Sequence, residues 1–153
     1  MLIEKRTLRL RWLILICGII LLSLAWLRGE AIDALLALGL GLSGGFVLDW
    51  LGIKKLRLWD YPRQPFLGLK YFIIALPDWG VIGMTINLLW NLIEIPLLAF
   101  IAVAVVIFLT HDLPNLLTRS WQYHAPMWLV AIGWGIFILS FRILSTTLSS
   151  IIS

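Results

Sequence analysis

Asp78 is the residue whose type and position most strongly suggest chemistry. It lies twelve residues beyond Phe66 in a long apolar stretch, about 18 Å into a helix that begins there. A charged side chain near the middle of a bilayer costs about 2.5–3.5 kcal/mol, so such residues often mark functional sites. Pro77 precedes it and removes a backbone hydrogen bond, as in the discontinuous helices of transport sites. The alternative is a proline kink, with Asp78 turned inward and hydrogen-bonded to a neighbouring helix.

If Asp78 is catalytic, we expect it to act as an acid or base, with Asp49 assisting. The candidate counter-ions for Asp78 are Arg142 and Lys70. Arg142 alternatively extends its side chain to the bilayer interface. Its other possible carboxylate partners are Glu94 and Asp33.

Five histidine and aspartate residues near one membrane surface form a candidate metal site. Imidazole and carboxylate groups suit zinc, manganese or iron. Their spacing is not diagnostic, and His111 is also favourably placed at the carboxyl end of a helix. A haem or chlorophyll on either histidine is a further alternative, so the cofactor is left open. The five residues are Asp49, Asp60, His111, Asp112 and His124.

Glycines indicate where helices pack closely. Gly41 and Gly45 form a small-xxx-small face, and Gly133 with Gly135 offers a second smooth patch. The segment 39–44 also matches the dinucleotide-binding pattern G-x-G-x-x-G. That pattern requires a strand before it and a helix after it, whereas here it lies inside one apolar segment. We therefore interpret these glycines as packing residues.

The composition of the whole chain is typical of an integral membrane protein. Of its 153 residues, 61% are hydrophobic and 13% are charged, whereas soluble domains carry about 25% charged residues. The single cysteine, Cys17, excludes a disulfide framework and multi-cysteine metal centres. Apolar runs of about 20 residues favour helices over the alternating strands of a barrel. We predict one all-α domain with five transmembrane helices over residues 12–27, 31–53, 66–89, 92–110 and 127–148.

The distribution of cations predicts the orientation of these helices. Cytoplasmic loops are enriched in lysine and arginine. Ten of the twelve cations fall on the N-terminal side of the expected bundle, and only Arg28 and Arg142 lie toward the other side. The N-terminus is therefore expected inside the cell membrane and the C-terminus outside, with the positive surface facing anionic lipid rather than nucleic acid. The ten cations are Lys5, Arg6, Arg9, Arg11, Lys54, Lys55, Arg57, Arg63, Lys70 and Arg119.

The connections between spans are short, and the two longest, residues 54–65 and 111–125, lie on the inner side. A short surface helix is expected to begin near Asn115. Between the third and fourth spans, Asn91 and Glu94 are expected to cap the fourth helix. Four loop aromatics are expected to anchor at the membrane interface, namely Trp59, Tyr61, Trp121 and Tyr123.

Three segments carry a family resemblance: Leu48–Gly52, Leu58–Pro62, and Pro65–Phe66 followed by Pro77 and Asp78. The pattern D-x-x-G, then W-x-Y-P, then a proline with an acid in the next helix resembles a family of small multi-spanning bacterial proteins of unknown function, known from spore formers. More distantly it is similar to the lycopene cyclase type, which converts carotenoid ends by acid chemistry and carries a proline followed by paired acids. This chain lacks the second acid. The resemblance implies one structural unit of Asp49, Trp59, Tyr61 and Asp78.

Three functions follow from these patterns. The first is an accessory or assembly subunit of a larger membrane complex, because the sequence has glycine-lined helices and no catalytic motif. Its partners would be other membrane subunits or further copies of the chain. The second is an intramembrane enzyme on an isoprenoid or other lipid, with Asp78 as the acid or base. The third is a small oligomeric transporter or channel, with Asp78 and the Pro77 break near the midplane.

Overall fold

The structure is a computed structural model that describes residues 2–62, 64–117, 119 and 121–152, with side chains described from Trp12 onward. The described part of the chain is helical except for one pair of two-residue strands and the connecting loops. Three of the helical rods contain a wide π-helical segment, here labelled η. In chain order the elements are α1 Leu2–Leu27, α2 Ala31–Asp49, η1 Trp50–Lys55, β1 Trp59–Asp60, η2 Tyr71–Ala75, α3 Leu76–Leu92, α4 Pro96–Ile107, η3 Phe108–Asp112, α5 Leu113–Leu117, β2 Gln122–Tyr123 and α6 Met127–Ile152.

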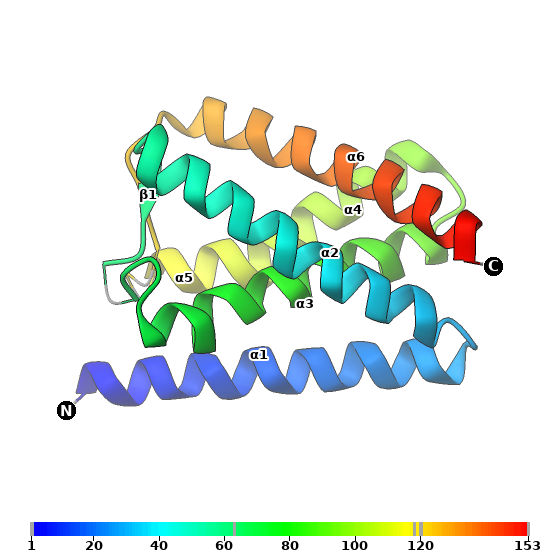
Figure 1. Ribbon diagram of the computed structural model, residues 1–153, viewed down its shortest axis with the longest axis horizontal. Helices are drawn as coiled ribbons and strands as arrows, with labels where there is room; N and C mark the ends of the chain where they lie inside the picture. The colour runs from blue at the N-terminus through cyan, green and yellow to red at the C-terminus, as the bar shows by residue number, and fades with distance from the viewer. Residues whose placement is uncertain (1, 63, 118, 120, 153) are drawn as a thin grey trace.

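The helical rods run back and forth along one long axis, so that the two chain ends lie at opposite ends of the bundle (Figure 1). Four rods are long and apolar enough to cross a membrane: 31–55, 71–92, 96–117 and 127–152. The apolar part of α1, residues 12–27, is shorter. We call the end that carries the N-terminus, β1 and β2 the loop end of the bundle.

The central rod is α3, which contacts α1, α2, α4 and α6. In its most apolar 18-residue window 72% of the residues are buried, compared with 11% in α6. Apolar side chains on the other rods consequently face outward, as lipid-exposed helices require. The arrangement is inverted relative to a water-soluble bundle, whose outer faces would be polar.

The closest helix contact joins α2 to α3. A side chain at Gly41 would overlap the backbone of Trp79, and one at Gly45 would overlap its indole ring. Small residues are what permit helix backbones to approach this closely. The glycines of α6 differ, because Gly133 faces open space and Gly135 faces the ring of Phe100, 3.6 Å from the position a Cβ would take.

The rods are shifted from the expected spans at their ends. The third begins at Tyr71 rather than residue 66, because a turn closed by the Gly68 N–H to the Pro65 carbonyl precedes it. The fourth begins at Pro96 rather than residue 92, and it extends to Leu117 rather than residue 110. Ile95 is extended, as residues before proline usually are, and proline suits the first helical turn.

Two local expectations are wrong. Asn91 and Glu94 do not cap the fourth helix: Ile95 is its N-cap, and no side chain caps it. Asn91 instead belongs to α3 and accepts a hydrogen bond from Arg142 at 2.9 Å. The expected surface helix near Asn115 is also not separate, since α5 continues the rod of α4 and η3.

At the loop end, β1 and β2 pair antiparallel and join the two long loops. Trp59 lies opposite Tyr123, and the Leu58 carbonyl accepts the N–H groups of residues 124 and 125. The loop aromatics therefore turn inward rather than anchoring at the interface. Tyr61 is 6% exposed and Trp121 is 4% exposed, and both belong to the main core.

Candidate functional site

Asp78 forms a buried polar cluster with two residues from the fourth rod. Its Oδ1 lies 2.6 Å from Nδ1 of His111, and its Oδ2 accepts a hydrogen bond from Nδ2 of Asn115 at 3.1 Å. Asn115 also donates to the backbone carbonyl of His111 at 2.9 Å, which fixes the two side chains relative to each other. All three residues are buried, and their hydrogen bonds offset the cost of removing these polar groups from water.

The cluster lies near the loop end rather than at the middle of the bundle. Because its rod begins at Tyr71, Asp78 is about 10 Å along the helix axis and not the expected 18 Å. The helix also continues through Pro77 instead of breaking there. The π turn of η2 precedes the proline, and the Leu76 N–H bonds to the Tyr71 carbonyl. This wide turn leaves room for the proline ring, which would otherwise clash with the preceding turn.

The expected counter-ions of Asp78 are wrong. His111 and Asn115 are its observed partners, whereas Arg142 hydrogen-bonds Asn91 and lies over the ring of Trp90 at 5.9 Å. Arg142 also does not take Glu94 or Asp33 as a partner at ion-pair distance in the described chain.

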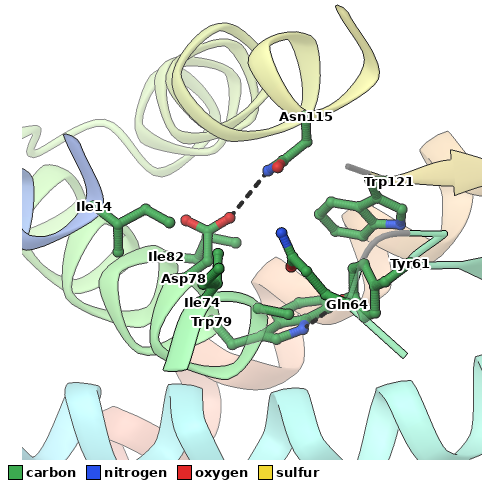
Figure 2. Close-up of a pocket in the computed structure, with 10 residues that line it drawn as sticks. Ile14, Tyr61, Gln64, Ile74, Asp78, Trp79, Ile82, Asn115 and Trp121 are labelled. Carbon is green, nitrogen blue, oxygen red and sulfur yellow. Dashed lines mark hydrogen bonds between the residues drawn. The ribbon is translucent and has the colours of Figure 1, made fainter. Parts of the chain in front are cut away.

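A small, partly enclosed pocket of about 10 Å³, with space for about one water molecule, adjoins Asp78. Figure 2 shows the Gln64 side chain reaching into it between Asp78 and Trp121, with Asn115 on the opposite wall. Gln64 is 2% exposed, and its Nε2 has no hydrogen-bond partner among the described residues. The indole N–H of Trp121 also has no hydrogen-bond partner within that part of the chain. The pocket thus combines the Asp78 carboxylate and the Asn115 amide with two further N–H donors. These donors belong to Gln64 and Trp121 and have no acceptor among the described residues.

Asp49 is a second buried carboxylate, and four neutral side chains donate to it. Trp59 and Tyr61 donate to Oδ1 at 3.0 and 2.8 Å, and Tyr71 and Trp79 donate to Oδ2 at 2.9 Å each. Four donors match the lone pairs of an ionised carboxylate. Burial, together with the charge of Asp49, holds the pKa of Tyr61 well above its usual value, so this hydroxyl stays a donor.

Asp112 is the third buried carboxylate. Its Oδ2 accepts a bond from the Tyr123 hydroxyl at 3.4 Å, and that hydroxyl accepts one from the Trp134 indole at 3.2 Å. Its Oδ1 has no partner in the described part of the molecule. Burial and the nearby Asp112 raise the pKa of Tyr123, which keeps its hydroxyl protonated.

The five candidate metal ligands do not come together. His111 belongs to the Asp78 cluster, Asp49 and Asp112 have their own partners, and His124 pairs with Asp60 at 3.1 Å on the exposed surface. No group of three or more His, Cys, Asp or Glu residues suited to a metal occurs within the described residues. The five candidate residues therefore do not gather into one metal-binding group in the described part of the chain.

Two apolar grooves lie beside α6. One of about 210 Å³ is bounded by η1, the loop strands and the first half of α6. The other, of about 520 Å³, lies between α4 and α6. Trp79 and Trp121 line both the first groove and the small pocket at Asp78, so these two indoles separate the two spaces.

Sequence reasoning identified Asp78 and Asp49 but missed most of their partners. Asn115 follows His111 by four residues, which places both on one helix face, and this spacing was an available signal. Gln64 carried no signal, because its burial depends on a fold of the loop that sequence does not reveal. Comparisons with protein families, curated proteins and solved structures give no match for this chain.

Proposed function

We propose that this protein crosses a lipid bilayer five times, with the N-terminus and the loop end on the cytoplasmic side. Four rods have the length and hydropathy for crossing, and α1 supplies a fifth apolar segment. The termini lie at opposite ends of the bundle, as an odd number of crossings requires (Figure 1). Lys54, Lys55 and Arg57 follow α2 at the loop end, and cytoplasmic loops favour cations.

We further propose that the protein is an intramembrane enzyme that acts on a lipid by acid–base chemistry at Asp78. The observation that carries this proposal is the buried contact between Asp78 and His111 at the wall of a polar pocket. Ionisable pairs inside a membrane domain are costly and commonly serve proton transfer. The groove of about 210 Å³ on the other side of Trp79 and Trp121 has an apolar lining suited to part of a lipid chain.

We propose different roles for the two members of the pair. Asp78 lines the pocket and is the catalytic residue that exchanges a proton with the bound group. His111 contacts Asp78 from the fourth rod and acts as a positioning residue that also carries the proton between turnovers. Asn115 holds both in place. The N–H donors of Gln64 and Trp121, which have no acceptor among the described residues, would orient an oxygen of the substrate.

The test is conversion of membrane lipids by the purified protein. Proteoliposomes made from a total bacterial lipid extract, including isoprenoids, are incubated and analysed by mass spectrometry. We expect the wild-type protein to convert one lipid class, Asp78→Asn to lose at least 100-fold in rate, and His111→Gln to lose less and to show a shifted pH profile. Asp60→Asn is the matched control, since Asp60 pairs with an exposed histidine away from the pocket.

Two outcomes would overturn the enzyme proposal. One is an unchanged rate in folded Asp78→Asn, and the other is the absence of any conversion by folded wild-type protein. The accessory-subunit hypothesis from the sequence stays a prediction, for which co-purification of a partner after mild solubilisation is the test. The transporter hypothesis also stays a prediction, with proteoliposome flux that depends on Asp78 as its test.

A further inference from the structure

The pocket beside Asp78 is small enough to limit the size of its ligand. Its volume of about 10 Å³ accommodates one water molecule, and a larger group could enter only if the lining side chains moved. A water bound inside a protein makes roughly two to four hydrogen bonds. The pocket therefore suits a water molecule if its walls supply a donor and an acceptor.

Gln64 supplies the donor. This side chain is 2% exposed, and its Nε2 has no acceptor among the described residues. Figure 2 shows the amide nitrogen turned toward the side of the pocket that carries Asp78 and Asn115. A buried N–H group without an acceptor is costly, and an unplaced water is a common explanation for such a group. A water in the pocket would supply the oxygen that the Gln64 amide lacks.

Asp78 supplies the acceptor. Its Oδ1 lies 2.6 Å from Nδ1 of His111, and its Oδ2 accepts a bond from Asn115 at 3.1 Å. A carboxylate has about four acceptor sites, so these oxygens can accept a further bond. A water between Gln64 and Asp78 would accept a bond from the amide and donate one to the carboxylate. In that orientation a carboxylate can act as a general base on the water.

The surroundings of the pocket favour attack of this water on a carboxylic ester rather than on a phosphate ester. None of the described residues that line the pocket is a lysine or an arginine. Phosphoryl transfer relies on cations to stabilise the charge on several oxygens. Hydrolysis of a carboxylic ester develops charge on one oxygen, for which N–H donors suffice.

We propose that the pocket binds one water molecule and that this water is the second reactant, so that the enzyme hydrolyses carboxylic esters of lipids. The inference rests on the proposed function, because it names the co-substrate of the reaction at Asp78. The lipid approaches from the apolar groove on the other side of Trp79 and Trp121. These two indoles separate the spaces, so they must move apart for the ester to contact the water.

The reaction consumes one ester and one water and gives one carboxylic acid and one alcohol. An O–H bond of the water breaks and its proton passes to Asp78, while the water oxygen bonds to the carbonyl carbon. The bond between that carbon and the alkoxy oxygen then breaks. The alcohol leaves with the proton from Asp78, which restores the carboxylate.

The test on the wild-type protein uses water labelled with ¹⁸O. Proteoliposomes made from the bacterial lipid extract are incubated in this water, and the products are analysed by mass spectrometry. We expect the new carboxylic acid to carry one heavy oxygen and the alcohol none. Label in the alcohol or in a phosphate, or conversion without label, would overturn the inference and leave the acid–base enzyme in place. Absence of any conversion would overturn the enzyme and the hydrolysis together.

Infrared spectroscopy tests the water site without turnover. A water in the pocket should give an O–H stretching band that shifts when the purified wild-type protein is transferred into water labelled with ¹⁸O. Absence of such a band would overturn the water site, whether or not any variant folds.

Two glutamine variants locate the water. Gln64→Leu keeps the approximate volume of the side chain but removes its N–H donor. Gln122→Leu is the matched control, since Gln122 is exposed on β2 and lines none of the spaces described above. We expect Gln64→Leu to lose the infrared band and to hydrolyse lipid about tenfold more slowly, and Gln122→Leu to retain both. An unchanged band and rate in folded Gln64→Leu would contradict the assignment.

Discussion

Asp49 connects more separate segments through its side chain than any other residue described above. It lies at the end of α2 and accepts bonds from β1, the loop that follows it, η2 and α3. Asp49→Asn would place an NH2 group against one phenol and one indole N–H, and the indole can only donate. We expect a loss of about 3 kcal/mol in the free energy of unfolding, because buried donors would lack acceptors. Unfolding in mixed detergent–SDS micelles, followed by tryptophan fluorescence, measures this loss.

Asp33→Asn provides the comparison for Asp49→Asn. Asp33 accepts one bond from Ser149 at 2.7 Å near the opposite end of the bundle, in a partly buried position. Removing its charge should cost less than about 1 kcal/mol. Similar losses in the two variants would show that the four-donor arrangement at Asp49 contributes little to stability.

Sequence reasoning at the residue scale identified the carboxylates and, through the family resemblance, two donors to Asp49, Trp59 and Tyr61, but not the partners of Asp78. Asp49 and Asp78 stood out because a carboxylate in an apolar segment is expensive and so needs an explanation. The partner of Asp78 is His111, which is 33 positions away, and the packing of two rods brings them together. Arg142 seemed a better partner by charge, yet it lies near Trp90 and Asn91 instead. Charge alone therefore did not identify the contact.

At the scale of elements, the contact between α2 and α3 depends on residues that have no side chain. Gly45→Ala would direct a methyl group into the indole of Trp79, which is held by its bond to Asp49. Because that ring has little freedom to move, we expect a loss of about 2–3 kcal/mol in stability. Gly39→Ala, which meets open space, should be neutral or stabilising by up to about 1 kcal/mol. The same unfolding assay applies, and an equal effect of the two substitutions would contradict the packing argument.

The spans were largely predictable as elements, but their ends were not. Apolar runs located every rod, and the second and fifth were expected to begin at residues 31 and 127, where they do begin. The third rod was misplaced because Phe66 and its neighbours are apolar yet form a turn, with Leu67 at φ 67°. A run of apolar residues indicates that the segment is buried in protein or lipid. It does not show whether the segment is a buried turn or a helix.

The π-helical segments had no signal in the sequence. η1, η2 and η3 all lie toward the loop end, next to or including Asp49, Tyr71 and His111. Each wide turn changes which side chains point inward, so that the adjacent residues His111 and Asp112 are both buried. A regular helix rotates successive side chains by about 100°, which makes burial of both neighbours harder. The polar sites consequently depend on backbone irregularities that a hydrophobic pattern does not reveal.

At the scale of the whole molecule, three buried carboxylates gather toward one end of the bundle axis. The buried carboxylates Asp49, Asp78 and Asp112, the paired strands and the apolar groove beside η1 all lie toward the loop end. The opposite end carries short turns, including Arg28 to Glu30, where Gly29 has φ 75°. In a membrane protein organised in this way, the candidate functional groups lie close to one side of the bilayer. The proposed orientation makes that side the cytoplasm.

Cysteine labelling tests this orientation for the whole molecule. In a Cys17→Ala background, single cysteines replace Arg28, Lys55 or Ser150, all exposed positions at the two ends of the bundle. We expect a membrane-impermeant maleimide to label the Arg28→Cys and Ser150→Cys proteins in intact cells, since these positions would face outward. The Lys55→Cys protein should be labelled only after permeabilisation, because cations are retained inside. Labelling of Lys55→Cys alone in intact cells would reverse the orientation, and labelling of all three would exclude the five-span arrangement.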